Sequence, residues 1–206
     1  MRVLNRALLS TMIIAMAAMA SAVDMDIPDI PDTGYRPGLS DKELRLSPGG
    51  MAAATSFLPD AKSAARYAPD AAFDGVPATA WVEGKADDGI GEKIGFARFQ
   101  RVSGIRILAG LGAKAYFKKN NRVKSAALSI FEVREETATQ DGMVYSLGKL
   151  AKRINLQFRD EMSKQEFSVG VTSKTGKGYL CVLEIKEVYR GTSCRDTCIS
   201  EIEVIE

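Results

Sequence analysis

The chain has 206 residues, of which 46% are hydrophobic and 26% are charged, and it contains no histidine. The missing histidine excludes a Ser-His-Asp or Cys-His nucleophile, a histidine general base and a metal site built on imidazole. With 28 basic and 26 acidic residues, the chain lacks the positive excess typical of nucleic-acid-binding proteins, so no nucleic-acid partner is expected.

The first 22 residues have the pattern of a secretory signal peptide. Arg2 and Arg6 precede an uncharged apolar stretch at 7–20, and the small residues at 20–22 suit a signal peptidase. The alternative is a membrane anchor, but the apolar stretch is shorter than the roughly 17 to 25 residues of a spanning helix. We therefore predict that residues 1–22 are removed, and that the mature chain is secreted or periplasmic and has no membrane span.

Residues 23–50 are rich in proline and aspartate. Pro28, Pro31 and Pro37 interrupt any helix, and six acidic side chains in this segment repel one another. A segment of this composition buries too little apolar surface to offset the entropy lost on ordering. We therefore predict a flexible acidic linker at 23–50, with a partner-binding tail as the alternative.

From residue 51 to 206, short apolar runs alternate with polar and glycine-containing turns. Seven runs have period two, which is typical of a strand with one buried face. Their alternating apolar residues are Ile94 and Phe96, Ile105 and Ile107, Leu128 and Ile130, Ile154 and Leu156, Phe167 and Val169, Leu183 and Ile185, and Ile202 and Val204. Only 69–73 and 143–152 look helical. The pattern predicts one all-β domain at 51–206, folded as an antiparallel β-sandwich.

An oxygen-rich turn lies between residues 74 and 79. Asp74, followed by Gly75, and the Thr79 hydroxyl offer the kind of oxygen ligands that calcium takes, with backbone carbonyls supplying the rest. The alternative is that Asp74 only caps its own turn by accepting hydrogen bonds from nearby backbone N–H groups. The turn is therefore a candidate structural calcium site.

Trp81 follows this turn at the start of a predicted strand, and the first acidic residue, Glu83, lies two positions after it. An indole face can stack on a sugar ring, although the same position suits a core anchor of the sandwich. Better ligand candidates are Glu83, Asp87 and Asp88, because they lie in a glycine-rich loop that a β-sandwich presents at one end of its sheets. Hydrolysis of a glycoside would need two carboxylates held roughly 5 to 9 Å apart. A glycine-containing loop does not hold Glu83 and Asp87 or Asp88 so firmly, so no enzymatic activity is expected.

A basic, amide-rich segment begins at Tyr116. The Tyr116 ring can stack on a sugar, and Asn120, Asn121 and Arg122 can form hydrogen bonds with sugar hydroxyls. Two alternatives are that the basic side chains follow phosphates, or that the segment is a solvated turn without a ligand. The small net charge disfavours the phosphate alternative.

The chain has three cysteines, at 181, 194 and 198. In an exported protein, cysteines are more often bridged than reduced. Cys194 and Cys198 are separated by three residues and can meet across a turn, so we predict a disulfide between them. Cys181 lies in an apolar run and is expected to be a small buried strand residue; a bridge from Cys181 to Cys198 is the alternative.

Two segments carry a family resemblance. AFDGVPATAW at 72–81 and CISEIEV at 198–204 resemble the two ends of a discoidin-like (coagulation factor 5/8 type C) galactose-binding jelly roll. WVEGKADDGIGE at 81–92, KNNRVK at 119–124 and DTCISEI at 196–202 look more closely like the glycan-binding translocation domain found beside bacterial NAD glycohydrolases. The resemblance implies an eight-stranded jelly roll with a binding role.

The resemblance also implies a third calcium ligand, because a glutamate of the last strand often completes the site in discoidin-like relatives and Glu201 stands at the matching place. We therefore predict a secreted, non-catalytic recognition module that binds carbohydrate through loops at one end of the sandwich. A protein-interaction or envelope-assembly module with the same fold is the alternative. The predicted ligand-binding residues are Trp81, Glu83, Tyr116, Asn120, Asn121 and Arg122, and the predicted calcium ligands are Asp74, Thr79 and Glu201.

Overall fold

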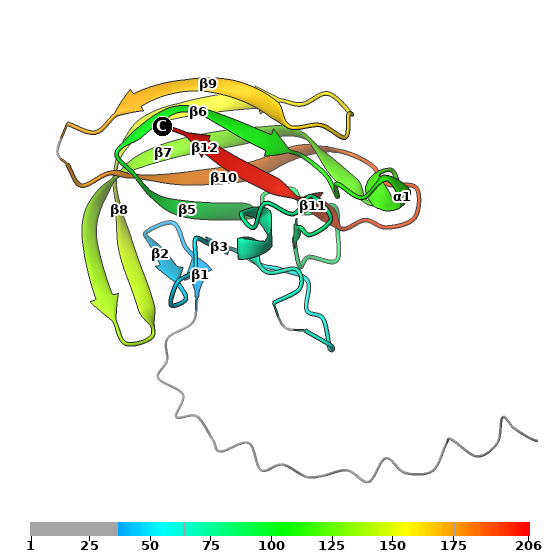
Figure 1. Ribbon diagram of the computed structural model, residues 1–206, viewed down its shortest axis with the longest axis horizontal. Helices are drawn as coiled ribbons and strands as arrows, with labels where there is room; N and C mark the ends of the chain where they lie inside the picture. The colour runs from blue at the N-terminus through cyan, green and yellow to red at the C-terminus, as the bar shows by residue number, and fades with distance from the viewer. Residues whose placement is uncertain (1–36, 64, 175) are drawn as a thin grey trace, which may run out of the picture. The chain divides into compact units, whose positions relative to one another are not determined.

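Alternating apolar side chains give this chain its strands, which in the computed structural model form two sheets packed face to face (Figure 1). The structure describes residues 37–63, 65–174 and 176–206, so the predicted signal peptide and linker residues 23–36 lie outside the described residues. In the described ranges, no helix has the length and apolar character needed to cross a membrane. The elements in chain order are β1 (Gly38–Leu39), β2 (Glu43–Leu46), β3 (Ala52–Ala54), the 3-10 helix η1 (Pro69–Ala72), β4 (Trp81–Val82), β5 (Lys93–Phe99), β6 (Arg101–Leu108), α1 (Lys114–Phe117), β7 (Asn121–Thr139), β8 (Gly142–Gln157), β9 (Gln165–Thr172), β10 (Tyr179–Tyr189), β11 (Thr197–Ile199) and β12 (Glu201–Ile205).

The two sheets have the arrangement of a jelly roll. Five strands in the order β8-β7-β10-β5-β3 form the body of the larger sheet, and β12-β6-β9 form the smaller one. Strands β1 and β2 extend the larger sheet beyond β8, and β4 and β11 attach beside the start of β7. Strands pair antiparallel, except that β11 runs parallel to β7. The predicted antiparallel β-sandwich is confirmed, and all seven period-two runs lie in strands.

The helix predicted at 143–152 is wrong, because this segment belongs to β8. Residues 143–146 pair with β2 on one side and with β7 on the other. Met143, Tyr145 and Leu147 follow the period of a strand and pack into one apolar cluster. The short helix predicted at 69–73 is confirmed as η1.

The main core lies between the two sheets. Trp81, Phe96 and Leu128 are fully buried there, together with isoleucines from β5, β6, β7 and β10. The Phe96 ring contacts the Phe73 ring at a centroid distance of 5.2 Å, which ties the loop after η1 to the larger sheet. The core therefore fixes both the strands and the loop that leads to β4.

The predicted flexible linker is wrong for residues 37–50, because these residues belong to the folded unit. Leu39, Leu44 and Leu46 are buried in a second apolar cluster on the outer face of the larger sheet. Gly95 makes room for them, since a Cβ atom there would lie 3.0 Å from the Leu39 and Leu44 side chains. The alternation of leucines outweighs the proline and aspartate content of the segment, so β1 and β2 form.

Candidate functional site

A pocket of about 590 Å³ lies among the loops that flank β4, α1 and β11. Helix α1 and strand β11 lie at the end of the sandwich away from the tip of the β7–β8 hairpin (Figure 1). The pocket combines tyrosine and aliphatic faces with a few polar groups, which suits a ligand that has both an apolar face and hydroxyl or amine groups. Its lining residues are Leu58, Arg66, Tyr67, Ala78, Thr79, Ala80, Val82, Leu111, Ala113, Tyr116, Asn120, Cys194, Asp196 and Cys198.

Helix α1 presents Tyr116 to the pocket. The next residue, Phe117, is buried and anchors the helix, whereas 53% of the Tyr116 surface is exposed. The Asn120 side-chain amide donates a hydrogen bond to the Tyr116 carbonyl at 3.1 Å, and the Lys119 ammonium lies 5.1 Å from the Tyr116 ring centroid. A single turn of helix therefore places an aromatic face and an amide side by side.

Asn121 and Asp88 hold the loop at residues 190–196 against the start of β7. The Asn121 side chain donates to the Arg195 carbonyl at 2.6 Å and accepts from the Gly191 N–H at 2.7 Å. The buried Asp88 carboxylate accepts from Arg195 and Arg190, each at 3.0 Å, and the Arg195 hydrogen bond holds its pKa below the usual value. Asn121 is 1% exposed, so it acts inside the protein on the loop that forms one wall of the pocket.

Glu83 is fully buried beneath this loop. Its carboxylate accepts hydrogen bonds from the backbone N–H groups of Lys85 at 2.7 Å and Thr197 at 3.1 Å. Burial raises its pKa. Gly89 has φ +68°, and a Cβ atom there would lie 2.5 Å from the Glu83 side chain, so glycine is required at this position. Glu83 therefore joins the loop at 84–92 to β11 and does not line the pocket.

Arg122 points inward and binds Asp160. Its guanidinium donates two hydrogen bonds to the Asp160 carboxylate, at 3.0 and 2.8 Å, and one each to the carbonyls of Asn120 and Arg190, both at 2.9 Å. The Arg122 hydrogen bonds hold the pKa of Asp160 below its usual value, with help from Lys118. All but 5% of the Arg122 side chain is buried.

Trp81 lies in the main core. Its side chain is fully buried, and the indole N–H donates to the Ser56 carbonyl at 3.0 Å. Trp81 is therefore a core anchor, which was the alternative to sugar stacking, and its indole face is not open to solvent.

Of the six predicted ligand-binding residues, two line the pocket and four are buried behind it. Tyr116 and Asn120 line the pocket, whereas Trp81, Glu83, Asn121 and Arg122 do not. Sequence reasoning missed Tyr67, Leu58, Leu111 and Asp196, which come from four separate segments. Of these, only Asp196 lies inside a segment that the sequence had singled out, DTCISEI at 196–202.

The structure brings two of the predicted calcium ligands together and places the third in a buried position. Asp74 accepts from the Val76 N–H at 2.8 Å and from the Thr79 hydroxyl at 2.7 Å, so it does cap its own turn. Glu201 is buried, its Oε1 atom has no hydrogen-bond partner, and its Oε2 atom lies 3.7 Å from the Lys164 ammonium. Burial raises the Glu201 pKa, and the Asp74 charge adds to this effect.

The three predicted calcium ligands include only two carboxylates, and one of these, Glu201, is buried with an oxygen that lacks a hydrogen-bond partner. Among the described residues, no group of three His, Cys, Asp or Glu side chains is placed to hold a metal. A calcium site of hydroxyl, carbonyl and carboxylate oxygens needs no such group. The orphan Glu201 Oε1 is the atom that such an ion would satisfy.

The predicted disulfide between Cys194 and Cys198 is absent, because all three cysteines are free thiols. Cys198 is buried in β11 with its sulfur 3.8 Å from the Asp196 carbonyl. Cys194 is exposed, and its backbone N–H binds the Lys119 carbonyl at 2.9 Å. Burial raises the pKa of the Cys198 thiol and raises that of Cys181 to about 12, so these two are poor nucleophiles. Cys181 is the buried strand residue that was predicted.

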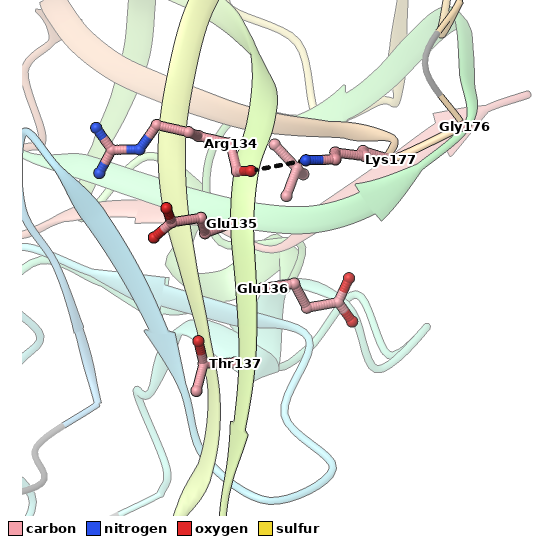
Figure 2. Close-up of a pocket in the computed structure, with 7 residues that line it drawn as sticks. Arg134, Glu135, Glu136, Thr137, Gly176 and Lys177 are labelled. Atoms are coloured by element: carbon pink, nitrogen blue, oxygen red, sulfur yellow. Dashed lines mark hydrogen bonds between the residues drawn. The ribbon is translucent and has the colours of Figure 1, made fainter.

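A second cavity of about 490 Å³ lies beside the outer half of β7. Figure 2 shows Glu135 and Glu136 leaving the strand on opposite sides, and the Lys177 ammonium donating to the Arg134 carbonyl, a bond of 3.1 Å. The lining residues, Val133, Arg134, Glu135, Glu136, Thr137, Gly176 and Lys177, include no aromatic side chain. The Lys177 contact covers part of the strand edge, which is a common way to protect an edge from pairing with another chain.

These features define a small β-sandwich that carries a loop-built pocket at one end. The chain belongs to the NAD glycohydrolase translocation F5/8 type C domain family, whose profile matches residues 49–205. The match covers the sandwich and begins just after β2, so β1 and β2 lie outside it.

Solved structures with a similar fold include carbohydrate-binding modules. The CBM32 of AlyQ in complex with 4,5-unsaturated mannuronic acid is 16% identical, with 76% of this chain and 95% of that chain covered and a TM-score of 0.42. An F5/8 type C domain from Bacteroides fragilis is 18% identical, with 74% and 89% covered and a TM-score of 0.44. Chitosan-binding module 2 from a Paenibacillus sp. IK-5 chitosanase/glucanase, in complex with chitotriose, is 14% identical, with 78% and 98% covered and a TM-score of 0.40. None of the curated proteins is detectably similar in sequence.

Proposed function

We propose that this protein is a secreted, non-catalytic recognition module that binds carbohydrate in the pocket beside α1. The observation that carries the proposal is the chemistry of the pocket: Tyr67 and Tyr116 offer aromatic faces, and Asn120 and Asp196 offer polar groups. A pyranose ring has an apolar face and a rim of hydroxyls, so both parts find partners. Secretion rests on the signal-peptide pattern at 1–22.

The absence of catalysis is part of the same proposal. The acids considered as a glycosidase pair, Glu83 with Asp87 or Asp88, all lie outside the pocket lining. Glu83 and Asp88 are buried and hydrogen-bonded, whereas Asp87 is exposed. Among the described residues that line the pocket, Asp196 is the single carboxylate. Hydrolysis of a glycoside needs a pair of carboxylates across the bond.

We expect Tyr116→Ala to weaken binding without destabilising the fold. A glycan array with the purified protein identifies the ligand, and calorimetry measures its affinity for each variant. Loss of one aromatic contact, worth about 0.5–1.5 kcal/mol beyond buried area, lowers affinity roughly threefold to tenfold. The melting temperature should stay that of the wild type, because the ring is 53% exposed.

Leu150→Ala is the matched control, since Leu150 is a similarly exposed apolar side chain on β8, outside the pocket. Equal losses in Tyr116→Ala and Leu150→Ala would contradict a site at the pocket. If the protein binds no glycan on the array, and an envelope protein co-purifies with the wild type but not with Tyr116→Ala, the protein-interaction alternative would replace carbohydrate binding.

We also propose that calcium binds at the turn held by Asp74 and Thr79, with Glu201 and backbone carbonyls completing the site. The ion would stabilise the turn and neutralise the buried Glu201 carboxylate. The proposal is supported by the unsatisfied Glu201 Oε1 atom and by the Asp74 charge felt at Glu201. The proposed role of the ion is structural, and the ion takes part in no chemical step.

Calcium should raise the melting temperature, and a chelator should reverse the rise. At about 100 times the dissociation constant, the gain is about 2.7 kcal/mol, or roughly 5–11 °C for a chain of this size. Glu201→Gln should abolish the rise, yet leave the calcium-free protein no less stable at neutral pH. The reason is that a carboxyl whose pKa is raised in the folded state opposes folding once the pH exceeds its unfolded value.

Glu203→Gln is the control for this experiment, because Glu203 lies on the same strand but is exposed and pairs with Arg106 and Lys164. Glu203→Gln should keep the calcium response. A melting temperature that does not respond to calcium or chelator in the wild type would rule out the calcium site.

A further inference from the structure

Among the described residues that line the pocket, Asp196 is the acidic one, and no cationic side chain pairs with it. Asp196 lines the pocket, and its carboxylate has no hydrogen-bond or ion-pair partner among the described residues. We propose that Asp196 determines the ligand class, so that the pocket takes neutral sugars and, preferentially, amino sugars, and rejects uronic acids. The inference rests on the proposed carbohydrate-binding function and deepens it.

The position of Asp196 is fixed by its neighbours in sequence. Arg195 on one side binds the Asp88 carboxylate and the Asn121 side chain. Thr197 on the other side donates its N–H to Glu83 and its hydroxyl to the Asp88 carbonyl at 2.7 Å. The Asp196 carbonyl accepts from the Asn121 N–H at 3.0 Å. With both flanking residues and its own carbonyl held, the backbone of Asp196 is fixed at the pocket wall, which lowers the entropy lost on binding.

The other charges close to the pocket already have partners. The Arg66 guanidinium lies 3.1 Å from the Asp60 carboxylate and 5.2 Å from the Tyr67 ring centroid. Arg190 and Arg195 are committed to Asp88. The Lys119 ammonium lies over the Tyr116 ring, and Lys119 is not among the lining residues. A ligand in the pocket therefore meets one unpaired negative charge.

The chemistry of a carboxylate decides which ligands benefit. A carboxylate only accepts hydrogen bonds, so it needs hydroxyl or ammonium donors on the ligand. Hydrogen bonds with charge on both sides are stronger than those between neutral groups, which favours an ammonium. A uronic acid would bring a second carboxylate towards Asp196, and like charges that meet at a site reduce affinity. The tyrosine and leucine faces of the pocket contact the apolar side of any of these rings and do not discriminate between them.

The test uses matched trisaccharides of glucose, glucosamine and glucuronic acid, with the corresponding galactose series, measured by calorimetry on the purified protein. The wild type should bind the amino sugar best and the uronic acid worst. Asp196→Asn keeps the shape of the side chain but removes its charge. We expect it to lower amino-sugar affinity about tenfold more than neutral-sugar affinity, and to improve uronic-acid binding.

Glu135→Gln, an exposed carboxylate at the second cavity, is the control and should leave all affinities unchanged. A wild-type preference for the uronic acid, or the same ratio of affinities in Asp196→Asn, would overturn the role of Asp196. In that case, continued sensitivity of binding to Tyr116→Ala would leave the proposed function intact. If no sugar binds the wild type, the proposed function fails and the inference fails with it.

Discussion

Arg122→Ala should unfold the protein at a lower temperature and should not act as a simple binding mutation. The substitution leaves the Asp160 carboxylate without its two guanidinium hydrogen bonds, and it leaves the carbonyls of Asn120 and Arg190 without a donor. Breaking a buried ion pair from one side costs about 3–5 kcal/mol. Because Asp160 is 28% exposed, we expect the lower end, about 3 kcal/mol, or roughly 6–12 °C in melting temperature.

Lys118→Ala is the matched control, since Lys118 binds the same carboxylate at 2.6 Å from an exposed position. An exposed ion pair contributes about 0–1 kcal/mol, so its removal should shift the melting temperature little. Arg122→Lys should lie between the two, because lysine keeps the charge but cannot make the paired hydrogen bonds to Asp160. Wild-type stability combined with lost ligand binding in Arg122→Ala would contradict the structural role.

The same ion pair sets part of the acid sensitivity of the fold. The Arg122 hydrogen bonds lower the pKa of Asp160 in the folded protein from its ordinary value of 3.8. A carboxyl with a lowered pKa adds stability at pH values above its unfolded pKa, and this stability is lost as the pH falls through the folded value. Urea unfolding should therefore be measured for wild type and Arg122→Ala at pH 7 and again below pH 4. The difference in the free energy of unfolding between the two proteins should be smaller at the acid pH.

The strands were predictable because each one shows its period-two alternation of apolar residues within its own short segment of sequence. Ile105 with Ile107 and Leu183 with Ile185 each mark a strand whose inner face is buried in the main core. The segment at 143–152 misled because its apolar residues also fit a helix, and only the pairing of β8 with β2 and β7 selects the strand. Where the apolar alternation of a segment fits only a strand, the local sequence is enough to predict the element. Where the apolar residues fit a helix as well, as at 143–152, the pairing with neighbouring strands decides.

The roles of neighbouring residues in the site were not predictable from the sequence. Asn120 and Asn121 are adjacent and identical, yet one lines the pocket and the other is 1% exposed. The difference arises because β7 begins at Asn121, so that its side chain meets Asp88 and Arg195, which are 33 and 74 residues away in the chain. Contacts over such separations follow from the packed fold and leave no local pattern.

Trp81→Ala should be the most damaging substitution among the residues considered for sugar stacking. The indole is fully buried in the main core, and its N–H satisfies the Ser56 carbonyl. Replacing a buried tryptophan with alanine costs about 3–5 kcal/mol. We therefore expect a loss of roughly 6–20 °C in melting temperature, with ligand binding reduced only in proportion to the unfolded fraction.

Fluorescence gives a direct check of the same point, because Trp81 is the only tryptophan in the chain. A buried indole should emit at shorter wavelength than an exposed one and should resist quenching by iodide in the native protein. Saturating sugar should leave this emission unchanged in the wild type, since the ring does not line the pocket. Protection of Trp81 from quencher by bound sugar, or a stable Trp81→Ala protein that no longer binds, would place the indole in the ligand site and contradict its core role. Tyr116→Ala supplies the contrast, because there the loss of affinity is expected at an unchanged melting temperature.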